Sequence, residues 1–127
     1  MKTSLINPST GIYPAEDYAH GILLTGFEKL LFVSGTMGLA PDHSAPATLE
    51  EQLVLVWDNI RRILAEAGME VDNIVRLTSY MRDGSYAEAN RDARLSALGG
   101  RRIPTTAIVV ETLEPGWLIE IEIIAAA

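Results

Sequence analysis

The chain has 127 residues, 48% of them hydrophobic, which is enough for one domain over residues 1–127 with a core that needs no crosslinks. Its formal net charge of -7 disfavours nucleic acid as a partner, because phosphate binding needs clustered positive charge, and favours small molecules or proteins. Cysteine, a signal peptide and a long apolar run are all absent, so we expect a cytoplasmic protein without disulfides, a thiolate nucleophile or a membrane span.

The N-terminal part of the chain is expected to consist of an arm followed by a hairpin. Residues 1–17 mix Pro, Ser, Thr and Gly with few apolar side chains, which predicts an extended arm rather than a packed element. The next stretch, HGILLTGFEKLLFVSGTMGL, has two apolar runs separated by residues 25–29. This pattern is typical of a β-hairpin with a long loop.

A long helix is predicted after this hairpin. Thr48 and Glu51 fit a capping box, in which each side chain accepts a hydrogen bond from a free backbone N–H at the helix start. Apolar residues recur from there to about Ala67 at three- and four-residue steps, so one face of the helix is apolar. Trp57 lies on that face and is interpreted as a core residue. Gly68 is suited to the left-handed cap that ends the helix.

The second half of the chain predicts three strands and a shorter helix. Residues 73–83 alternate between apolar and polar side chains, as in a strand with one polar face. A second capping box, from Ser85 to Glu88, begins a helix that ends near Gly99 and Gly100. The stretches TTAIVVETL and WLIEIEII then form two strands joined by a turn at residues 114–116.

The resulting order, β-β-α-β-α-β-β, predicts an α+β fold in which a mixed sheet carries both helices on one face. Two helices with one apolar stripe each cannot cover the second face. That face contains Leu118 and Ile124 and needs another partner. We therefore expect a closed oligomer whose subunits cover it.

The last predicted strand, GWLIEIEII, contains two carboxylates among large apolar side chains. Because side chains alternate along a strand, Glu120 and Glu122 share one face. Burial among aliphatic residues raises the pKa of a carboxyl group and favours its protonated form, which suits a general acid or base. A salt bridge between subunits or a solvated edge strand would account for the pattern equally well.

Ser34, Gly35 and Trp117 carry weaker signals. Ser34 ends an apolar run, where a serine more often bonds neighbouring backbone than acts as a nucleophile. Gly35 would permit close approach of a ligand to the backbone. Trp117 fits either a core residue or a residue at a subunit interface.

The histidines and one arginine pair are interpreted as structural or solvated. His20 and His43 stand apart from each other and from any third ligand, so we expect no metal. Arg101 and Arg102 follow the second helix and are expected to stabilise its C-terminal region.

Three ordered blocks of the sequence resemble the RidA/YjgF family of reactive-intermediate deaminases, whose older label is L-PSP endoribonuclease. The blocks are LLFVSGTMGLAPD, EEQLVLVWDNIRRILAEAGMEVDNIVRLTSYMRD, and IPTTAIVVETL with LIEIEIIA. The resemblance covers nearly all of the chain from Tyr18. It implies a chorismate-mutase-like fold: a homotrimer whose sheets form a central barrel, with the helices outside and clefts between subunits.

Members of this family hydrolyse reactive enamines and imines, such as 2-aminoacrylate, to ketoacids and ammonia without a metal or organic cofactor. Carried over residue by residue, the cleft positions fall on Tyr18, Gly35, Asn90, Thr105 and Glu120, and we add the neighbouring Ser34 and Thr106 as substrate-binding residues. The resemblance gives Glu120 the role of the acid that orients and activates the attacking water. Glu122 is assigned a structural role.

The resemblance fails at one position of this cleft. The family has an Arg where this chain has Thr105, and that Arg grips the substrate carboxylate through paired, charge-assisted bonds. A Thr hydroxyl offers one neutral bond instead, and losing a charged hydrogen bond costs about 1.5–3 kcal/mol. The hairpin around TGFEK is also longer than in the deaminase branch. Both features resemble the Arg-less branches of the family.

We therefore expect a metal-independent hydrolase of a reactive enamine, imine or similar labile metabolite, with Glu120 as acid/base and no cofactor. The alternative is a non-catalytic trimer that binds a small molecule or a protein in the same clefts. Endoribonuclease activity is the least favoured interpretation, since the net charge of -7 opposes RNA binding.

Overall fold

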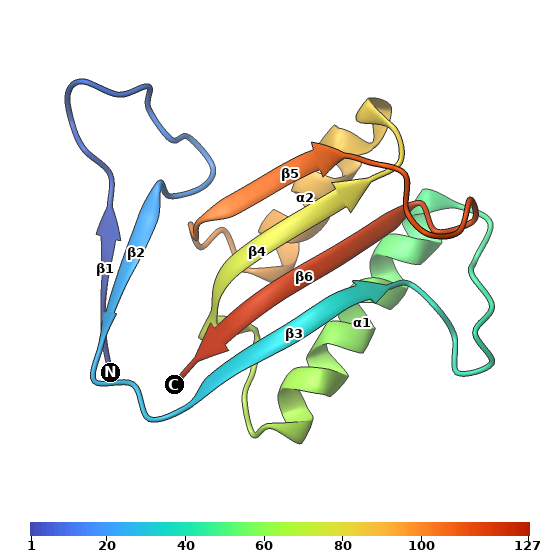
Figure 1. The fold of residues 1–127 in the computed structure, drawn as a ribbon, viewed down its shortest axis with the longest axis horizontal. Helices are drawn as coiled ribbons and strands as arrows, with labels where there is room; N and C mark the ends of the chain where they lie inside the picture. Colours follow the sequence, from blue (N-terminus) through green and yellow to red (C-terminus); the bar gives the residue numbers. More distant parts are fainter.

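The computed structural model describes all 127 residues and contains a four-stranded sheet, a separate two-stranded sheet and two helices (Figure 1). The strands are β1 Lys2–Ile6, β2 Gly21–Thr25, β3 Leu30–Met37, β4 Ile74–Met81, β5 Thr105–Val109 and β6 Ile119–Ala126. The helices are α1 Leu49–Glu66 and α2 Ala87–Ala97. The larger sheet has the order β3-β6-β4-β5, and only its β4–β5 pair is parallel. This is the expected α+β fold with a mixed sheet.

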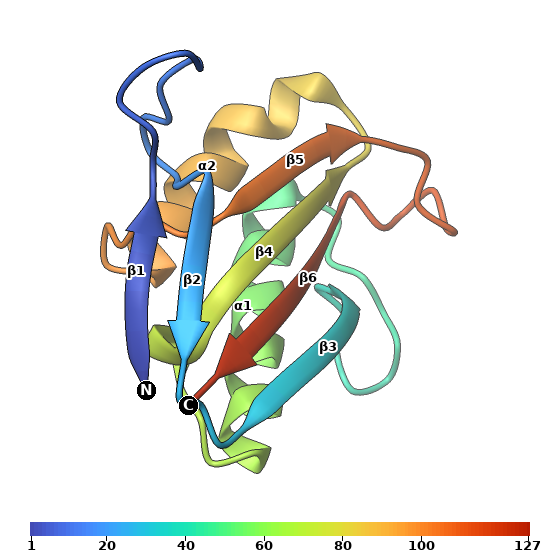
Figure 2. The same cartoon turned by 60° about the vertical axis from the view of Figure 1, so that its left-hand side comes forward.

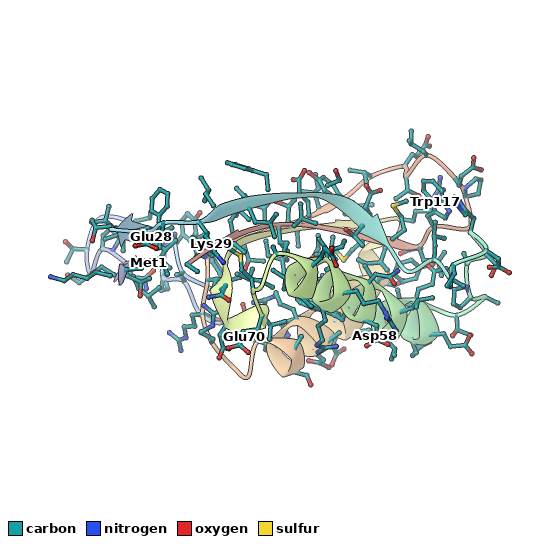
Figure 3. All side chains as sticks on the ribbon, turned by 90° about the horizontal axis from the view of Figure 1, so that it is seen from below. Met1, Glu28, Lys29, Asp58, Glu70 and Trp117 are labelled. Atoms are coloured by element: carbon teal, nitrogen blue, oxygen red, sulfur yellow. The ribbon has the colours of Figure 1, made fainter.

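Both helices cover the same face of the four-stranded sheet, as the view along the sheet in Figure 3 shows. The core lies between the helices and the sheet, and Trp57 of α1 belongs to it with 3% of its surface exposed. The strands contribute alternate residues, which include Leu77 and Met81 of β4 and Ile119, Ile121 and Ile123 of β6. None of the helices is both long and apolar enough to cross a membrane.

The start and end of α1 agree with the sequence prediction. Thr48 Oγ1 accepts a hydrogen bond from the Glu51 N–H at 3.2 Å, although the return bond from the Glu51 side chain does not form. Gly68 follows the helix with a φ of 68°, the left-handed conformation that glycine adopts without strain.

The predicted cap of α2 is wrong by two residues. Asp83, not Ser85, caps this segment, because its Oδ1 accepts the N–H of Ser85 at 2.9 Å. The bond opens a 3-10 turn, Gly84–Tyr86, which leads directly into α2. The Asp carboxylate is charged and so forms the stronger bond to the free N–H group.

The predicted hairpin between β2 and β3 is also wrong. β2 pairs with β1, antiparallel, and β3 pairs with β6. The two-stranded sheet lies beside the main sheet rather than within it (Figure 2). The joint between β2 and β3 is fixed instead to the C-terminus, since the N–H groups of Glu28 and Lys29 both donate to the Ala127 carbonyl at 2.8 Å. The observed pairing of β3 with β6 joins strands that are far apart in the sequence, and a local sequence pattern does not reveal such a pairing.

The region expected as an arm without a packed element therefore contains a strand. All five residues of β1 are exposed, so the strand is held by backbone pairing with β2 and not by burial. The role predicted for Arg101 is wrong too. Its Nη2 donates to the carbonyls of Val71 and Ile74, at 2.8 and 3.0 Å, and so fixes the entry to β4 rather than the end of α2.

The second face of the four-stranded sheet is covered by no element of this chain, as predicted. Phe32 of β3 is 70% exposed there, next to Ile124 of β6 in the strand register. We refer to this surface, formed by the outward residues of β3, β4, β5 and β6, as the open face. A large exposed aromatic beside aliphatic residues is typical of an interaction surface.

Candidate active site

Glu120 lies on the open face, between Met37 of β3 and Tyr80 of β4 in the strand register. Its strand neighbours, Ile119 and Ile121, are fully buried against the helices, so the alternation predicted from the sequence is confirmed. Partial burial raises the pKa of Glu120, and the negative charge of nearby Glu122 raises it further. The carboxyl group therefore holds a proton more tightly than an exposed glutamate does.

Gly35 brings the backbone of β3 against this carboxyl group. The pairing of β3 with β6 shifts register between Val33 and Thr36, and Gly35 sits within that irregularity. A Cβ atom at Gly35 would overlap Oε1 of Glu120, so the position accepts only glycine while Glu120 keeps its place. The close approach predicted for Gly35 is made by Glu120. Ser34 beside it is exposed, and its carbonyl accepts the Thr36 hydroxyl at 2.9 Å.

Glu120 lines a hollow of about 330 Å³, which we name the Glu120 hollow. The hollow is lined by Gly35, Tyr80, Val110, Glu111, Thr112, Leu113, Glu120 and Glu122. Three carboxylates face it and no Lys or Arg does, so its surroundings favour a ligand that is neutral or positively charged at this point.

The two glutamates of β6 differ in their partners. The Tyr80 hydroxyl donates a hydrogen bond of 3.1 Å to Oε1 of Glu122. This bond to a carboxylate, together with burial, raises the pKa of Tyr80 and keeps it protonated. Glu122 is thus held by a neighbour on β4, whereas Glu120 has no such bond. The two carboxyl groups therefore differ in that only the one on Glu122 is held by a hydrogen bond within the chain.

The loop over the Glu120 hollow is fixed by residues that sequence reasoning missed. Arg82 donates from Nε to Thr112 Oγ1 at 2.7 Å and from Nη2 to the Thr112 carbonyl at 2.9 Å. The Thr112 hydroxyl lies 2.7 Å from the carbonyl oxygen of Trp117. The Trp117 residue is half-buried and lies at the end of the molecule far from Met1 (Figure 3). The signal that was available is the polar face of the strand predicted over residues 73–83, which carries both Tyr80 and Arg82.

Tyr18, Asn90 and Thr105 line a second hollow, of about 270 Å³, which we name the Asn90 hollow. Asn90 is 3% exposed, and its Oδ1 lies 3.4 Å from Ser79 Oγ. Tyr18 is held here because the next residue, Ala19, donates its N–H to the carbonyl of Ile103, two residues before β5, at 3.1 Å.

The predicted site residues lie on both faces of the sheet, and the neighbours Thr105 and Thr106 point to opposite faces. Consecutive strand residues point to opposite faces. Thr105 faces the Asn90 hollow, and its hydroxyl donates to the Ile103 carbonyl at 3.0 Å. Thr106 faces the open side, where its hydroxyl accepts a bond from Arg76 at 2.7 Å. One chain therefore places Glu120 with Gly35 and, across the sheet, Asn90 with Tyr18 and Thr105, but does not bring the two groups together.

The histidines do not join either hollow. His20 Nε2 lies 2.7 Å from the Tyr13 carbonyl oxygen, and His43 adopts a left-handed φ of 72° in the loop before α1. No three His, Asp or Glu side chains of the chain converge in a way that could hold a metal ion. The donor groups of the site are thus carboxyl, hydroxyl and amide groups.

Comparison with known proteins identifies the family. A model of the family described as Endoribonuclease L-PSP matches residues 9–127. A RutC family protein from Pyrococcus abyssi is 30% identical over 115 residues, which cover 88% of this chain and 87% of that protein. A RutC family protein from Aquifex aeolicus is 34% identical over 71 residues, which cover 55% of this chain and 54% of that protein.

A solved structure shows the same fold over the whole chain. YyfB from Yersinia pestis, a protein of unknown function in the conserved Rid family, covers 100% of both chains with a TM-score of 0.85 at 24% identity. The fold is thus the chorismate-mutase-like fold of YjgF and Rid proteins. Because the family match spans all three sequence blocks that carry the resemblance, the chain belongs to the RidA/YjgF family, also described as the Endoribonuclease L-PSP family.

Proposed function

We propose that this protein is a metal-independent hydrolase that deaminates a reactive imine, enamine or similar labile metabolite, with Glu120 as its general acid and base. The observation that supports this most is the state of the Glu120 carboxyl group. It is half-buried with a raised pKa, lies against the backbone of Gly35, and faces an open hollow without a bonded partner. A carboxyl group whose pKa is raised above its ordinary value accepts a proton more readily and can return it to a reacting group.

The reaction assigned to this group conserves every atom of substrate and water. A water molecule adds to the carbon of the protonated C=N bond, whose electron pair passes to the nitrogen, while the Glu120 carboxylate takes one proton of the water. The resulting carboxylic acid then protonates the nitrogen of the neutral carbinolamine. The C–N bond breaks and ammonia leaves as the carbonyl forms, and the proton of the carbinolamine hydroxyl passes back to the Glu120 carboxylate. The negative charges of Glu111 and Glu122 around the hollow favour the protonated imine, which water attacks more readily.

We further propose that the complete site forms between two subunits of a homotrimer. One subunit would supply Glu120 and Gly35, and its neighbour would supply Tyr18, Asn90 and Thr105. Two observations support this arrangement: the two groups lie on opposite faces of the sheet in one chain, and the open face carries Phe32 without any cover. A hydrolase site of this kind needs both an acid and groups that hold the substrate.

A second candidate is a non-catalytic trimer that binds a small metabolite or a protein in the same clefts. It is favoured by the absence of an Arg at Thr105, whose hydroxyl is already engaged with the Ile103 carbonyl. Endoribonuclease activity, the activity in the name of the matching family, is favoured least. The three carboxylates of the Glu120 hollow and the net charge of -7 repel phosphate groups.

The two main candidates are separated by an ammonia-release assay on the purified protein. The substrates are 2-aminoacrylate generated in the assay and a set of imines that carry no carboxylate. The proposal predicts turnover above the rate in buffer for at least one substrate. Rates equal to buffer for all of them, together with saturable ligand binding in the cleft, would support the binding protein instead.

A further inference from the structure

The helical layer carries a groove of about 460 Å³ between α1 and α2, which we name the helix groove. The two helices cover the sheet face opposite the open face (Figure 3), so assembly through the open face leaves this groove accessible. The apolar part of its wall is formed by side chains of both helices: Leu53, Val54 and Trp57 of α1, and Ala89, Ala93 and Ala97 of α2.

The groove is hollow because α2 contributes only small apolar side chains to it. Ala89, Ala93 and Ala97 recur every four residues and therefore share one face of the helix. Across the groove, α1 offers larger apolar side chains, of which Val54 is 65% exposed. An apolar side chain of a partner would fit beside these alanines and remove Val54 from water.

The rim of the helix groove is negatively charged. It carries three carboxylates, those of Glu50, Asp58 and Asp92, and one cation, Arg61. Arg61 lies 3.4 Å from Asp58 and neutralises it. Glu50 forms no ion pair within the chain, and Asp92 has only an exposed contact of 3.8 Å with Arg91. The rim therefore complements Lys or Arg side chains of a partner.

The length of the groove matches that of a helix. Along α1 the groove extends from Glu50 to Arg61, about 16 Å at the rise of an α-helix, and along α2 from Ala89 to Ala97, about 12 Å. A helix of about three turns spans the same length. A second copy of this chain is a poor occupant, because its own net charge is -7.

We propose that the helix groove binds a basic amphipathic helix of a partner protein. The apolar face of that helix lies between α1 and α2, and its Lys or Arg side chains lie beside Glu50 and Asp92. This is the general way in which an apolar groove between helices receives an amphipathic segment. The inference uses no residue of the Glu120 hollow or the Asn90 hollow except the rim contact of Arg91, and it stands whether or not Glu120 turns over a substrate.

The test is an NMR titration of the intact oligomer with a synthetic amphipathic peptide of about 15 residues that carries Leu on one face and Lys on the other. The indole N–H of Trp57 is buried, has no acceptor within the chain and belongs to the groove wall, so its resonance should shift. The indole resonance of Trp117, which lies outside the groove, should not. The same peptide with Glu in place of Lys should bind at least about tenfold more weakly.

Two variants place the peptide in the groove. Val54→Lys should lower the affinity for the Lys peptide by about tenfold, because it puts a charge in the apolar wall. Asp92→Lys should lower it by about three- to tenfold, because it reverses a rim charge. Glu66→Lys is the matched control: it changes the net charge equally, on α1 but outside the groove, and should bind as the wild type does.

Four results would overturn the proposal. The first is equal affinity for the Lys and Glu peptides, or no binding of either at millimolar concentration. The second is wild-type affinity in Val54→Lys and Asp92→Lys proteins that melt like the wild type. The third is an equal loss in Asp92→Lys and Glu66→Lys, which would indicate general charge attraction. The fourth is hexylamine binding as tightly as the peptide, which would assign the groove to a small amine. None of these readouts uses catalytic turnover, so their failure is distinct from failure of the hydrolase proposal.

Discussion

At the scale of single residues, Glu120 and Glu122 show how two identical side chains on one strand face acquire different properties. Glu122 accepts a hydrogen bond from the Tyr80 hydroxyl, whereas Glu120 lies against Gly35 and faces the hollow. The sequence predicted that both share a face and that burial raises a carboxyl pKa. It did not predict which glutamate is bonded, because Tyr80 is 42 positions away from Glu122 along the chain.

The raised pKa of Glu120 predicts a pH-dependent stability difference between the wild type and Glu120→Gln. Since the folded state holds the proton more tightly, the resulting stabilisation is complete below the ordinary carboxyl pKa and is lost as pH rises through the folded pKa. Glutamine is neutral throughout. Thermal unfolding from about pH 4 to about pH 8 should therefore show the variant gaining stability relative to the wild type as pH rises. A constant difference across this range would show that the pKa of Glu120 is not raised.

Gly35→Ala should displace the Glu120 side chain, because an added Cβ meets its carboxyl group, and should lower stability by about 1 kcal/mol, because the end of this flexible side chain can move aside. Chemical denaturation measures the stability, and a crystal structure of the variant shows the side chain. Gly116→Ala is the matched control, since a Cβ there meets nothing within 4 Å. Equal stability of the two variants, with Glu120 in place, would contradict the close approach at Gly35.

At the scale of elements, local patterns predicted α1, β4 and β6 correctly because each is defined by its own periodicity and end signals. Pairing was less predictable. β2 and β3 follow each other in the sequence, yet β3 pairs with β6. The apolar residues of β6 that favour this pairing lie far from β2 and β3 in the sequence, so the local pattern of β2 and β3 does not predict it. The candidate site follows the same rule. Its residue types were predictable, whereas the division into two hollows depends on which face each strand residue takes.

The segment that carries Tyr18 is tied to α2 through Arg94, and this tie gives a testable prediction. Arg94 is buried, and it contacts the Asp17 carboxylate at 3.3 Å and the Asp17 carbonyl at 3.1 Å. Arg94→Ala should cost about 1–3 kcal/mol and speed hydrogen exchange at the Ala19 N–H. Arg91→Ala, which removes an exposed side chain 3.8 Å from Asp17, should cost at most about 1 kcal/mol. Similar exchange rates at Ala19 in both variants would show that Arg94 does not hold this segment.

At the scale of the whole molecule, the open face is the feature that one chain leaves incomplete. It exposes Phe32 and separates the Glu120 hollow from the Asn90 hollow. A trimer in which the sheets face one another would bury the aromatic ring and bring the two hollows of neighbouring subunits into one cleft. Assembly and function are thus linked in the proposal, because the same contact between subunits would hold the trimer together and complete the cleft.

Light scattering at micromolar concentration should accordingly give the mass of a trimer. Phe32→Glu should reduce that mass, because the charge enters the apolar interface, while Val54→Glu should not. The two positions are matched, since Phe32 is 70% and Val54 65% exposed in the single chain, but Val54 lies on α1, outside the proposed interface. A monomeric wild type would refute the shared cleft.

The measurement that tests the central claim most directly is the turnover of Glu120→Gln and Glu122→Gln on whichever imine the wild type hydrolyses. Glutamine keeps the shape of the side chain but cannot exchange the proton. The account predicts that Glu120→Gln loses about 10²–10⁴-fold in rate while the oligomer stays assembled, and that Glu122→Gln mainly loses stability. Full activity in an assembled Glu120→Gln protein would contradict the assignment of Glu120 as the acid and base of this reaction.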